Sequence, residues 1–462
     1  MLRSALTPIF PTFPTKTLPA ARRISSSAVA ATKPPQPVRR NAPPNYLTLP
    51  HLPPTSAYVH LPFCRRRCHY CDFPILALGT TSSSISEDPR IANYVDLICR
   101  EITATAALNP NADQPPLETV FFGGGTPSLV PPRLVKSVLD ALTVRFGLRP
   151  GAEVSMEMDP GTFGERELRE VMGLGVNRVS LGVQAFQEEM LKGCGRAHGL
   201  KEVDEAIEII VRSCNVENWS IDLIASLPGQ TPEMWEESLR RAIDARPTHV
   251  SVYDLQVEKE TKFAKMYTPG EHPLPSEKQS AEFYRMASKA LSGTGFNHYE
   301  ISSYCKTGYQ CRHNSTYWDN KSFYGFGLGA TSFLNGLRFP RPKKLKDYEG
   351  YVQSLESGTV TCFGEKNSDL NAGDMAMDVV MLALRTAKGL DLKPFGEAFG
   401  SSSVMSLLDV YKPYVETGHV LWLDEQRRNV TIGDAVSYIR LSDPDGFLLS
   451  NELISLAFCA LG

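Results

Sequence analysis

The chain has 462 residues, of which 42% are hydrophobic and 21% are charged, and this composition excludes a disordered, collagen-like or coiled-coil protein. Its net charge of −3 argues against a strongly basic nucleic-acid binder, and no apolar run is long enough to predict a membrane-spanning helix. Ten cysteines scattered unevenly over this length predict a metal site in a reducing compartment rather than a disulfide framework.

The first 60 residues differ in charge from the rest of the chain. They contain seven Lys or Arg and no Asp or Glu, which leaves 41 basic and 51 acidic residues for the remainder. A basic, acid-free segment rich in Ser, Thr, Ala and Pro is typical of an organellar transit peptide, and a basic tail that binds an acidic partner is the alternative. We expect residues 1–45 to be a transit peptide and linker that direct the chain to the mitochondrion or, alternatively, to the chloroplast.

From residue 57 onward, short β-rich runs alternate with amphipathic helical runs. The predicted strands span residues 58–61, 119–122, 154–157, 178–183, 219–224 and 249–255, and the predicted helices span 91–107, 132–146, 165–172, 201–212 and 232–245. This spacing predicts an α/β fold of βαβ units with a parallel sheet, which right-handed crossovers curl into a partial (β/α)6 TIM-like barrel. Functional residues should then lie just past the carboxyl ends of the strands.

Two further regions follow the barrel domain, which we place at residues 55–300. Residues 301–370 are rich in aromatic residues and glycine and are expected to form a connecting region. In residues 371–462 the pattern predicts helices at 375–385, 404–416 and 448–461 and a β-hairpin at 420–432. We therefore expect a small C-terminal α+β domain of winged-helix type.

Three cysteines follow the first predicted strand at the spacing C-x3-C-x2-C: Cys64, Cys68 and Cys71. Thiolates placed in this way on one loop can converge on one metal centre. A closed structural zinc or iron–sulfur site needs four ligands, whereas three leave one iron of a cubane cluster open to a small molecule. A zinc site completed by His69 or by a distant cysteine is the alternative.

The cysteine motif resembles that of the radical S-adenosylmethionine (SAM) superfamily. In that superfamily three thiolates hold a [4Fe–4S] cluster, and the amino and carboxylate groups of SAM chelate the open iron. The resemblance implies that an electron from the cluster can split SAM to a 5′-deoxyadenosyl radical, which requires an electron donor if SAM is cleaved. The protein would then position the cofactor, exclude water and shield the radical.

Glycines and polar residues near the ends of later strands suit the groups of SAM. Phe122-Gly-Gly-Gly-Thr-Pro-Ser128 follows the second strand; its glycines allow a ligand to approach the backbone, and it lacks the Lys-Ser/Thr ending of a phosphate loop. A carboxylate, an amide and an arginine suit an ammonium, a ribose diol and a carboxylate. By resemblance to the coproporphyrinogen-oxidase-like branch of the superfamily, the SAM contacts would be Tyr58, Gly124, Gly125, Thr126, Glu157, Gln184, Arg196 and Asp222.

Two groups of proteins share these motifs. The oxygen-independent coproporphyrinogen III oxidases have a further cysteine two residues after the third, where this chain has Phe73, and carry substrate-binding sequence where this chain has the transit-like segment. The chain more closely resembles the HemW family of haem chaperones, which has Cys-Asp-Phe after the cluster and a His-Asn-x-x-Tyr-Trp motif. In this chain that motif begins at His313, and a cysteine, Cys311, precedes it.

The family's motif is linked to haem binding, and an imidazole can ligate haem iron while aromatic side chains cover the porphyrin. His313, Tyr317 and Cys311 are the candidate axial ligands. The resemblance therefore implies a protein that binds haem and delivers it to an acceptor haemoprotein, with a [4Fe–4S] cluster and SAM as cofactors. A coproporphyrinogen III oxidase is the alternative, and a structural iron–sulfur scaffold that keeps its SAM contacts as relics is a third. Whether SAM is turned over, and so whether the chain is an enzyme, stays open.

Overall fold

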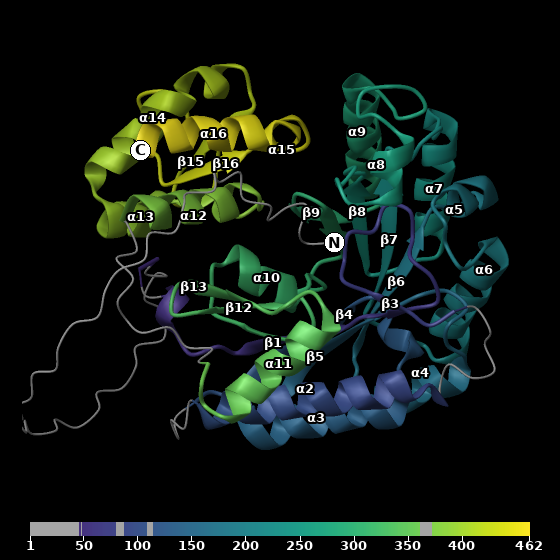
Figure 1. The fold of residues 1–462 in the computed structure, drawn as a ribbon. Helices are drawn as coiled ribbons and strands as arrows, with labels where there is room; N and C mark the ends of the chain where they lie inside the picture. The colour runs from purple at the N-terminus through teal and green to yellow at the C-terminus, as the bar shows by residue number, and fades with distance from the viewer. Residues whose placement is uncertain (1–45, 48, 80–86, 109–113, 361–371) are drawn as a thin grey trace, which may run out of the picture. The chain divides into compact units, whose positions relative to one another are not determined.

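A nine-stranded sheet forms the centre of the protein in the computed structural model (Figure 1). In spatial order its strands are β11 (Tyr324–Phe326), β1 (Ser56–Leu61), β4 (Leu117–Gly124), β5 (Leu148–Met158), β6 (Arg178–Gln184), β7 (Trp219–Ala225), β8 (His249–Asp254), β10 (Ser303–Cys305) and β9 (Asn297–Glu300). The strands from β11 to β8 are parallel to one another. Strand β10 is antiparallel to both of its neighbours, β8 and β9. The six predicted strands are thus adjacent and in chain order, which confirms the predicted α/β fold.

The structure describes residues 46–47, 49–79, 87–108, 114–360 and 372–462. The expected transit peptide, residues 1–45, lies outside the described residues. Within the described ranges the two edge strands, β11 and β9, do not pair with each other, so the sheet is open. No helix in these ranges is both long and apolar enough to cross a membrane.

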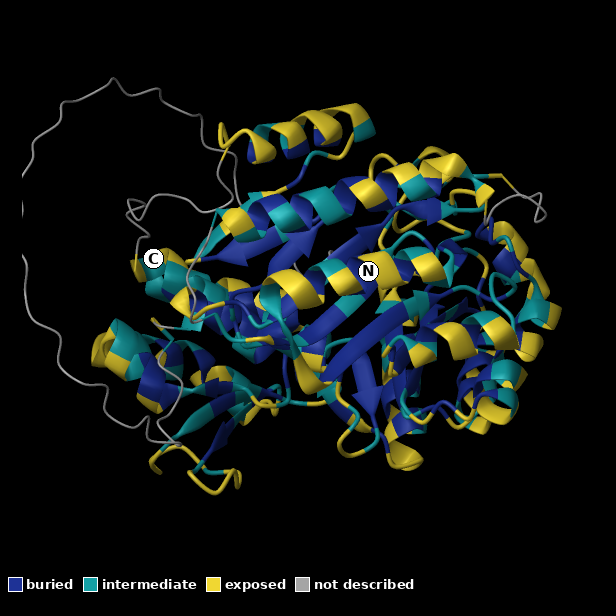
Figure 2. Cartoon of the chain, turned by 90° about the horizontal axis from the view of Figure 1, so that it is seen from below, coloured by how far each residue is buried: buried dark blue, intermediate teal, exposed yellow. Residues whose placement is uncertain are grey.

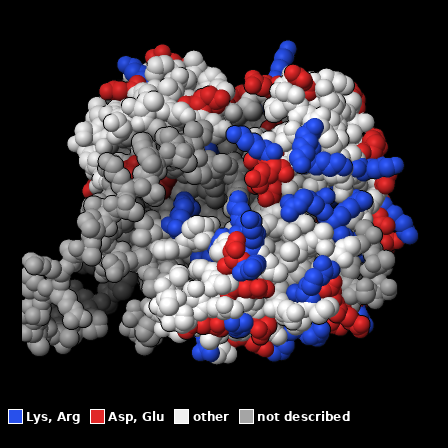
Figure 3. All heavy atoms as spheres, in the orientation of Figure 1, with Lys and Arg blue, Asp and Glu red and all other residues white. Residues whose placement is uncertain are grey.

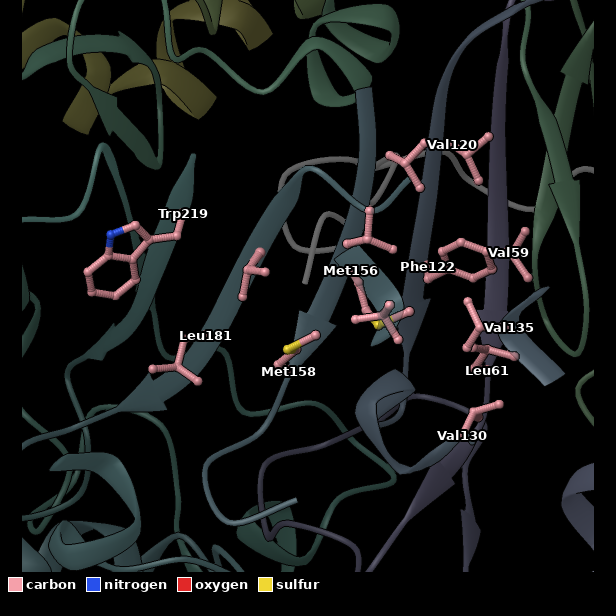
Figure 4. Packing of buried hydrophobic residues seen from close by; sticks show 14 of the residues in the cluster. Val59, Leu61, Val120, Phe122, Val130, Val135, Met156, Met158, Leu181 and Trp219 are labelled. Carbon is pink, nitrogen blue, oxygen red and sulfur yellow. The ribbon is translucent and has the colours of Figure 1, made fainter. Parts of the chain in front are cut away.

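Helices cover one face of the sheet, which is apolar. The helices after successive strands are α2 (Pro89–Ala107), α3 (Pro132–Phe146), α4 (Glu165–Gly173), α6 (Leu200–Glu208), α7 (Pro232–Asp244) and α9 (Glu277–Gly293). Their amphipathic patterns place apolar side chains against the sheet and leave charged ones outside, as the alternation of buried and exposed residues in Figure 2 shows. Phe122, Met156 and Leu181 belong to this core, and Val135 of α3 packs with them (Figure 4).

The opposite face of the sheet is largely polar, because many of the alternate residues of its strands are hydrophilic. Buried members of this set include Ser56, His60, Thr119, Glu153, Ser155, Arg178, Gln184, Ser220, Asp222, His249 and Ser251. A parallel sheet buried on both faces normally consists of continuous hydrophobic runs. A buried polar face therefore marks the side of the sheet on which a ligand site is to be sought.

The region between residues 301 and 360 completes the sheet domain. It contains α10 (Arg312–Trp318), β11, the hairpin β12 (Thr331–Leu334) and β13 (Leu337–Pro340), and α11 (Leu345–Glu356). Glu101 of α2, which is fully buried, fastens this region by accepting hydrogen bonds from the Gly327 amide (2.8 Å) and the Arg341 guanidinium (2.7 Å). Strand β11 is three residues long and contains a glycine, so the sequence has no alternating pattern from which this strand could be predicted.

The C-terminal region contains helices and a small sheet, as expected. Its elements are α12 (Ala372–Leu384), β14 (Leu390–Asp391), α13 (Leu392–Phe399), α14 (Ser401–Glu416), β15 (Val420–Leu423), β16 (Tyr438–Leu441), α15 (Asp445–Leu448) and α16 (Ser450–Leu461). Of the hairpin predicted at 420–432, the structure contains a single antiparallel bridge between Leu423 and Asn429, whereas the full ladder of β15 forms with β16. Ile439 and Leu441 are fully buried, whereas residues 425–429 are polar and exposed, so burial selects the later segment.

Candidate functional site

The three cysteines lie on a loop that leaves the carboxyl end of β1, where the barrel interpretation expects functional residues. In this loop the short strand β2 (Phe63–Cys64) pairs with β3 (Leu76–Ala77). Cys64, Cys68 and Cys71 are free thiols that are partly buried. On the face seen in Figure 3, Lys and Arg side chains gather over the place where Figure 1 shows β3.

The cysteine sulfurs lie beside donors of different kinds. The Thr126 hydroxyl donates a hydrogen bond to Cys64 Sγ (3.6 Å). Burial raises the pKa of the Cys64 and Cys71 thiols, because a thiolate without a metal would be poorly solvated there, and the backbone amide of Phe73 acts in the opposite direction on Cys71. Donors beside the sulfurs fit thiolates that carry negative charge on a cluster.

Arg196 supplies the third donor. Its Nη1 lies 3.4 Å from Cys68 Sγ, and its Nη2 forms a buried ion pair with Asp159, just past the end of β5. Burial alone would raise the pKa of the Asp159 carboxyl, but the charges of Arg196 and His198 outweigh it and hold that pKa below its ordinary value. Sequence reasoning missed Asp159, although it stands two residues after Glu157 at the same strand end.

His69 does not complete a zinc site in this arrangement. Its Nδ1 lies 2.9 Å from the carbonyl oxygen of Gly193, which can only accept, so Nδ1 carries the proton. Its Nε2 then accepts from the Lys262 ammonium at 2.9 Å. In the described ranges no three His, Cys, Asp or Glu side chains converge on one metal ion. The thiolates of a cluster bind different irons and need not meet at one point.

The glycine loop packs tightly against the cysteine loop. Gly124 has a φ of +112°, and a Cβ on it would stand 2.6 Å from the His60 ring. A Cβ on Gly125 would stand 2.6 Å from the Phe63 carbonyl oxygen. The amide of Thr126 donates to that same oxygen at 2.6 Å. The need for glycine in this loop therefore comes from the approach of two backbone segments, which fixes the glycine loop beside the cysteines.

Glu157 ends its strand next to the glycine loop. Its Oε2 accepts a hydrogen bond from the Gly124 amide at 3.1 Å. Burial raises the pKa of the Glu157 carboxyl to about 7, and the Asp222 carboxylate adds to the shift. A carboxyl that is poorly solvated in this way gains most when a cationic group such as an ammonium binds beside it.

The other expected SAM contacts differ in how far they are free to bind. Gln184 has a φ of 71°, and its buried Oε1 has no hydrogen-bond partner among the described residues. Asp222 already accepts hydrogen bonds from the Ser180 hydroxyl (3.0 Å) and the Ser220 hydroxyl (3.3 Å). The Tyr58 hydroxyl lies 3.1 Å from His60 Nδ1. Hydrogen bonds thus connect Gly124, Thr126, Glu157 and Arg196 to the cysteine and glycine loops. Asp222 instead bonds to serines on the strands of the polar face.

The His-Asn-x-x-Tyr-Trp motif forms α10, which packs on the polar face of the sheet. His313 is 1% exposed, and its Nδ1 lies 2.7 Å from the Thr119 hydroxyl of β4. Its Nε2 lies 2.8 Å from the Tyr317 hydroxyl. Burial lowers the pKa of His313 to about 3, so the ring is neutral. Both ring nitrogens therefore have protein partners.

Glu153 of β5 anchors the start of α10. Its carboxylate accepts hydrogen bonds from the backbone amides of Arg312 (3.2 Å) and His313 (3.1 Å). The Cys311 thiol lies 3.7 Å from the same carboxylate, and burial raises the pKa of that thiol to about 12. Thr119 precedes Gly124 on β4 by about 16 Å at the usual rise per residue, so α10 and the cysteine loop lie toward opposite ends of the polar face.

The fold and the three-cysteine loop together define a radical-SAM-type protein. A profile of the radical SAM superfamily matches residues 58–242. The solved structure of the coproporphyrinogen III oxidase HemN from Escherichia coli superposes with a TM-score of 0.70 at 21% identity, covering 89% of this chain and 92% of that one. That likeness establishes the fold.

Curated relatives show to which family within this class the chain belongs. A protein named "Heme chaperone HemW" from Synechocystis sp. is 40% identical over 89% of this chain and 98% of its own length. Proteins of the same name from Bacillus subtilis and Escherichia coli are 33% and 31% identical, over 79% and 88% of this chain and 92% and 98% of their own lengths. The chain belongs to the HemW family.

Proposed function

We propose that this protein binds haem and delivers it to an acceptor haemoprotein, using a [4Fe–4S] cluster and SAM as cofactors. The observation that supports the cofactors is the cysteine loop, in which the sulfurs of Cys64 and Cys68 accept hydrogen bonds from Thr126 and Arg196. Haem binding and delivery are supported by membership of a family whose relatives are named haem chaperones.

The residues around the cysteine loop would hold SAM. The Glu157 carboxylate would accept a hydrogen bond from the SAM amino group, since no cationic side chain of the described residues bonds to it. Gln184 Oε1 and Arg196 Nε are buried without hydrogen-bond partners in the part of the chain that the structure describes, so each is available to a ligand. When bound, the cluster supplies the electron that reductive cleavage of SAM requires.

The alternative, oxygen-independent coproporphyrinogen III oxidase, is disfavoured by Phe73. That residue stands where the oxidases carry a further cysteine. Its backbone amide lowers the pKa of the Cys71 thiol. The similarity to the HemN structure shows a shared fold and does not extend to activity.

One anaerobic experiment separates the two functions. The protein is reconstituted with iron and sulfide, and haem is titrated by its Soret band before transfer to a haem-free acceptor is followed. A parallel sample with reductant, SAM and coproporphyrinogen III is assayed for protoporphyrinogen. We expect haem binding and transfer without decarboxylation; decarboxylation without haem binding would establish the oxidase instead.

We further propose an organellar location. The charge asymmetry of the first 60 residues supports import, and both mitochondria and chloroplasts use such segments. Residues 1–60 fused to a fluorescent protein test this, and diffuse cytosolic fluorescence would exclude both organelles.

A further inference from the structure

Arg196 bridges the cysteine loop and the end of strand β5. On one side its Nη1 donates to Cys68 Sγ at 3.4 Å and to the Tyr70 hydroxyl at 3.1 Å. On the other side its Nη2 donates to the Gly182 carbonyl at 2.9 Å and pairs with the Asp159 carboxylate. The guanidinium is planar and its side chain is 8% exposed, so it cannot turn without breaking contacts on both sides.

Asp159 is itself held in place from two directions. Its backbone N–H donates to the Ser128 hydroxyl at 3.2 Å, and Pro160 follows it in the chain. Its second carboxylate oxygen faces the Nδ1 atom of His198 at 3.6 Å. The carboxylate therefore stands at a fixed distance from Arg196, and through Arg196 from the sulfur of Cys68.

The hydrogen bonds of Arg196 leave only Nε–H without a protein acceptor among the described residues. At most one N–H of this arginine is thus free for SAM, while an Nη1–H is directed at a cluster thiolate.

We propose that Asp159 is a positioning residue that fixes Arg196 against the Cys68 sulfur and offsets part of its charge, and that this pair sets the reduction potential of the cluster. The inference rests on the proposed function, in which the three cysteines bind a cluster. Positive charge and a hydrogen bond at a cluster sulfur favour the reduced, more negative cluster and raise its potential. A nearby carboxylate acts in the opposite direction.

Substitutions at the two ends of the ion pair should therefore move the potential in opposite directions. Asp159→Asn keeps an oxygen that can accept from Arg196 but removes the negative charge, so the potential should become more positive. Arg196→Gln removes the positive charge, so the potential should become more negative. A residue with a merely structural role would not produce shifts of opposite sign.

The experiment is anaerobic redox titration of the reconstituted cluster, followed by electron paramagnetic resonance and visible absorption, with iron content measured for each variant. Asp159→Glu keeps the charge and should stay near the wild-type potential. Asp140→Asn removes an exposed carboxylate of α3 that pairs with Lys136, and should leave the potential unchanged. Should Arg196→Gln fail to take up iron, Arg196→Lys replaces it and should give a smaller negative shift.

Shifts of opposite sign support the inference. A negative shift or no shift in Asp159→Asn, with iron content intact, overturns it and leaves the proposed function standing. A wild-type protein that takes up no cluster overturns both, and its haem titration then shows whether the haem part survives alone.

Discussion

The Nε2 atom of His313 lies 2.8 Å from the phenolic oxygen of Tyr317, one helical turn away on α10. The other ring nitrogen is hydrogen-bonded to Thr119 on the sheet. An iron atom that approaches His313 must therefore displace a protein partner, and Tyr317 is the one carried by the short helix itself. Haem ligation through Nε2 of His313 and the hydrogen bond of that atom to Tyr317 exclude each other.

This competition predicts the behaviour of two variants. Tyr317→Phe removes the competing hydroxyl, whose hydrogen bond contributes about 1 kcal/mol, so haem should bind roughly five times more tightly. His313→Ala should lose haem affinity. Titration of the Soret band measures both. If Tyr317→Phe loses as much affinity as His313→Ala, the phenol is the ligand; if neither changes, Cys311 becomes the candidate.

Serine in place of Cys64, Cys68 or Cys71 should abolish the visible absorption and the iron content of the reconstituted protein, because an alkoxide is a poor substitute for a thiolate on iron. Cys459, on α16 and exposed, provides the matched control, and its serine variant should keep a full cluster. Zinc at one equivalent in the wild-type protein would contradict the assignment.

Glu157 predicts a pH dependence for SAM binding. In the free protein its carboxyl has a pKa of about 7, raised by burial, so below pH 7 it is protonated and must release a proton to accept a hydrogen bond from the SAM amino group. Affinity should therefore rise with pH from 5.5 to 7, by at most about tenfold per unit. Calorimetry across this range should find weaker binding with a smaller slope for Glu157→Gln. A wild-type affinity without slope would show that the amino group lies elsewhere.

The raised pKa of Glu157 also affects the free energy of unfolding. A carboxyl whose pKa is higher in the folded than in the unfolded state destabilises the folded protein as pH rises from 4.5 to 7, and the full cost applies above pH 7. Glu157→Gln should thus increase the free energy of unfolding at pH 8, by about 3 kcal/mol, and have little effect at pH 4.5. Denaturant titrations at the two pH values compare them, and an equal effect at both would contradict burial of the charge as the cause.

Gly125 should not tolerate a side chain. A Cβ there would lie 2.6 Å from the Phe63 carbonyl oxygen, and backbone cannot move aside as a side chain can. We expect Gly125→Ala to cost about 1–3 kcal/mol and to impair cluster assembly. Gly173→Ala, at the end of α4 with no atom within 4 Å of the added Cβ, is the control and should be neutral or mildly stabilising. Thermal unfolding and iron content measure both effects.

Local patterns were sufficient to predict the order of the six central strands and the cysteine loop. Alternation of apolar and polar residues marks strands such as β5 and β6, and a C-x3-C-x2-C spacing is visible without any fold. The strands β9, β10 and β11 were not predicted, because they are three or four residues long and form only against a neighbour. The second strand of the C-terminal hairpin was misplaced for a similar reason, since burial selects β16.

The sequence by itself determined the ligand chemistry: which thiols, carboxylates and amides are available, and on which strand ends they stand. The tertiary structure decided which of them act together, because the contacts between Arg196 and Cys68 and between His313 and Thr119 join residues 128 and 194 positions apart. Such pairs depend on the packing of parallel strands, and no local pattern encodes it. For that reason Asp159, an ordinary carboxylate in the sequence, becomes the partner of the arginine at the cysteine loop only in the folded protein.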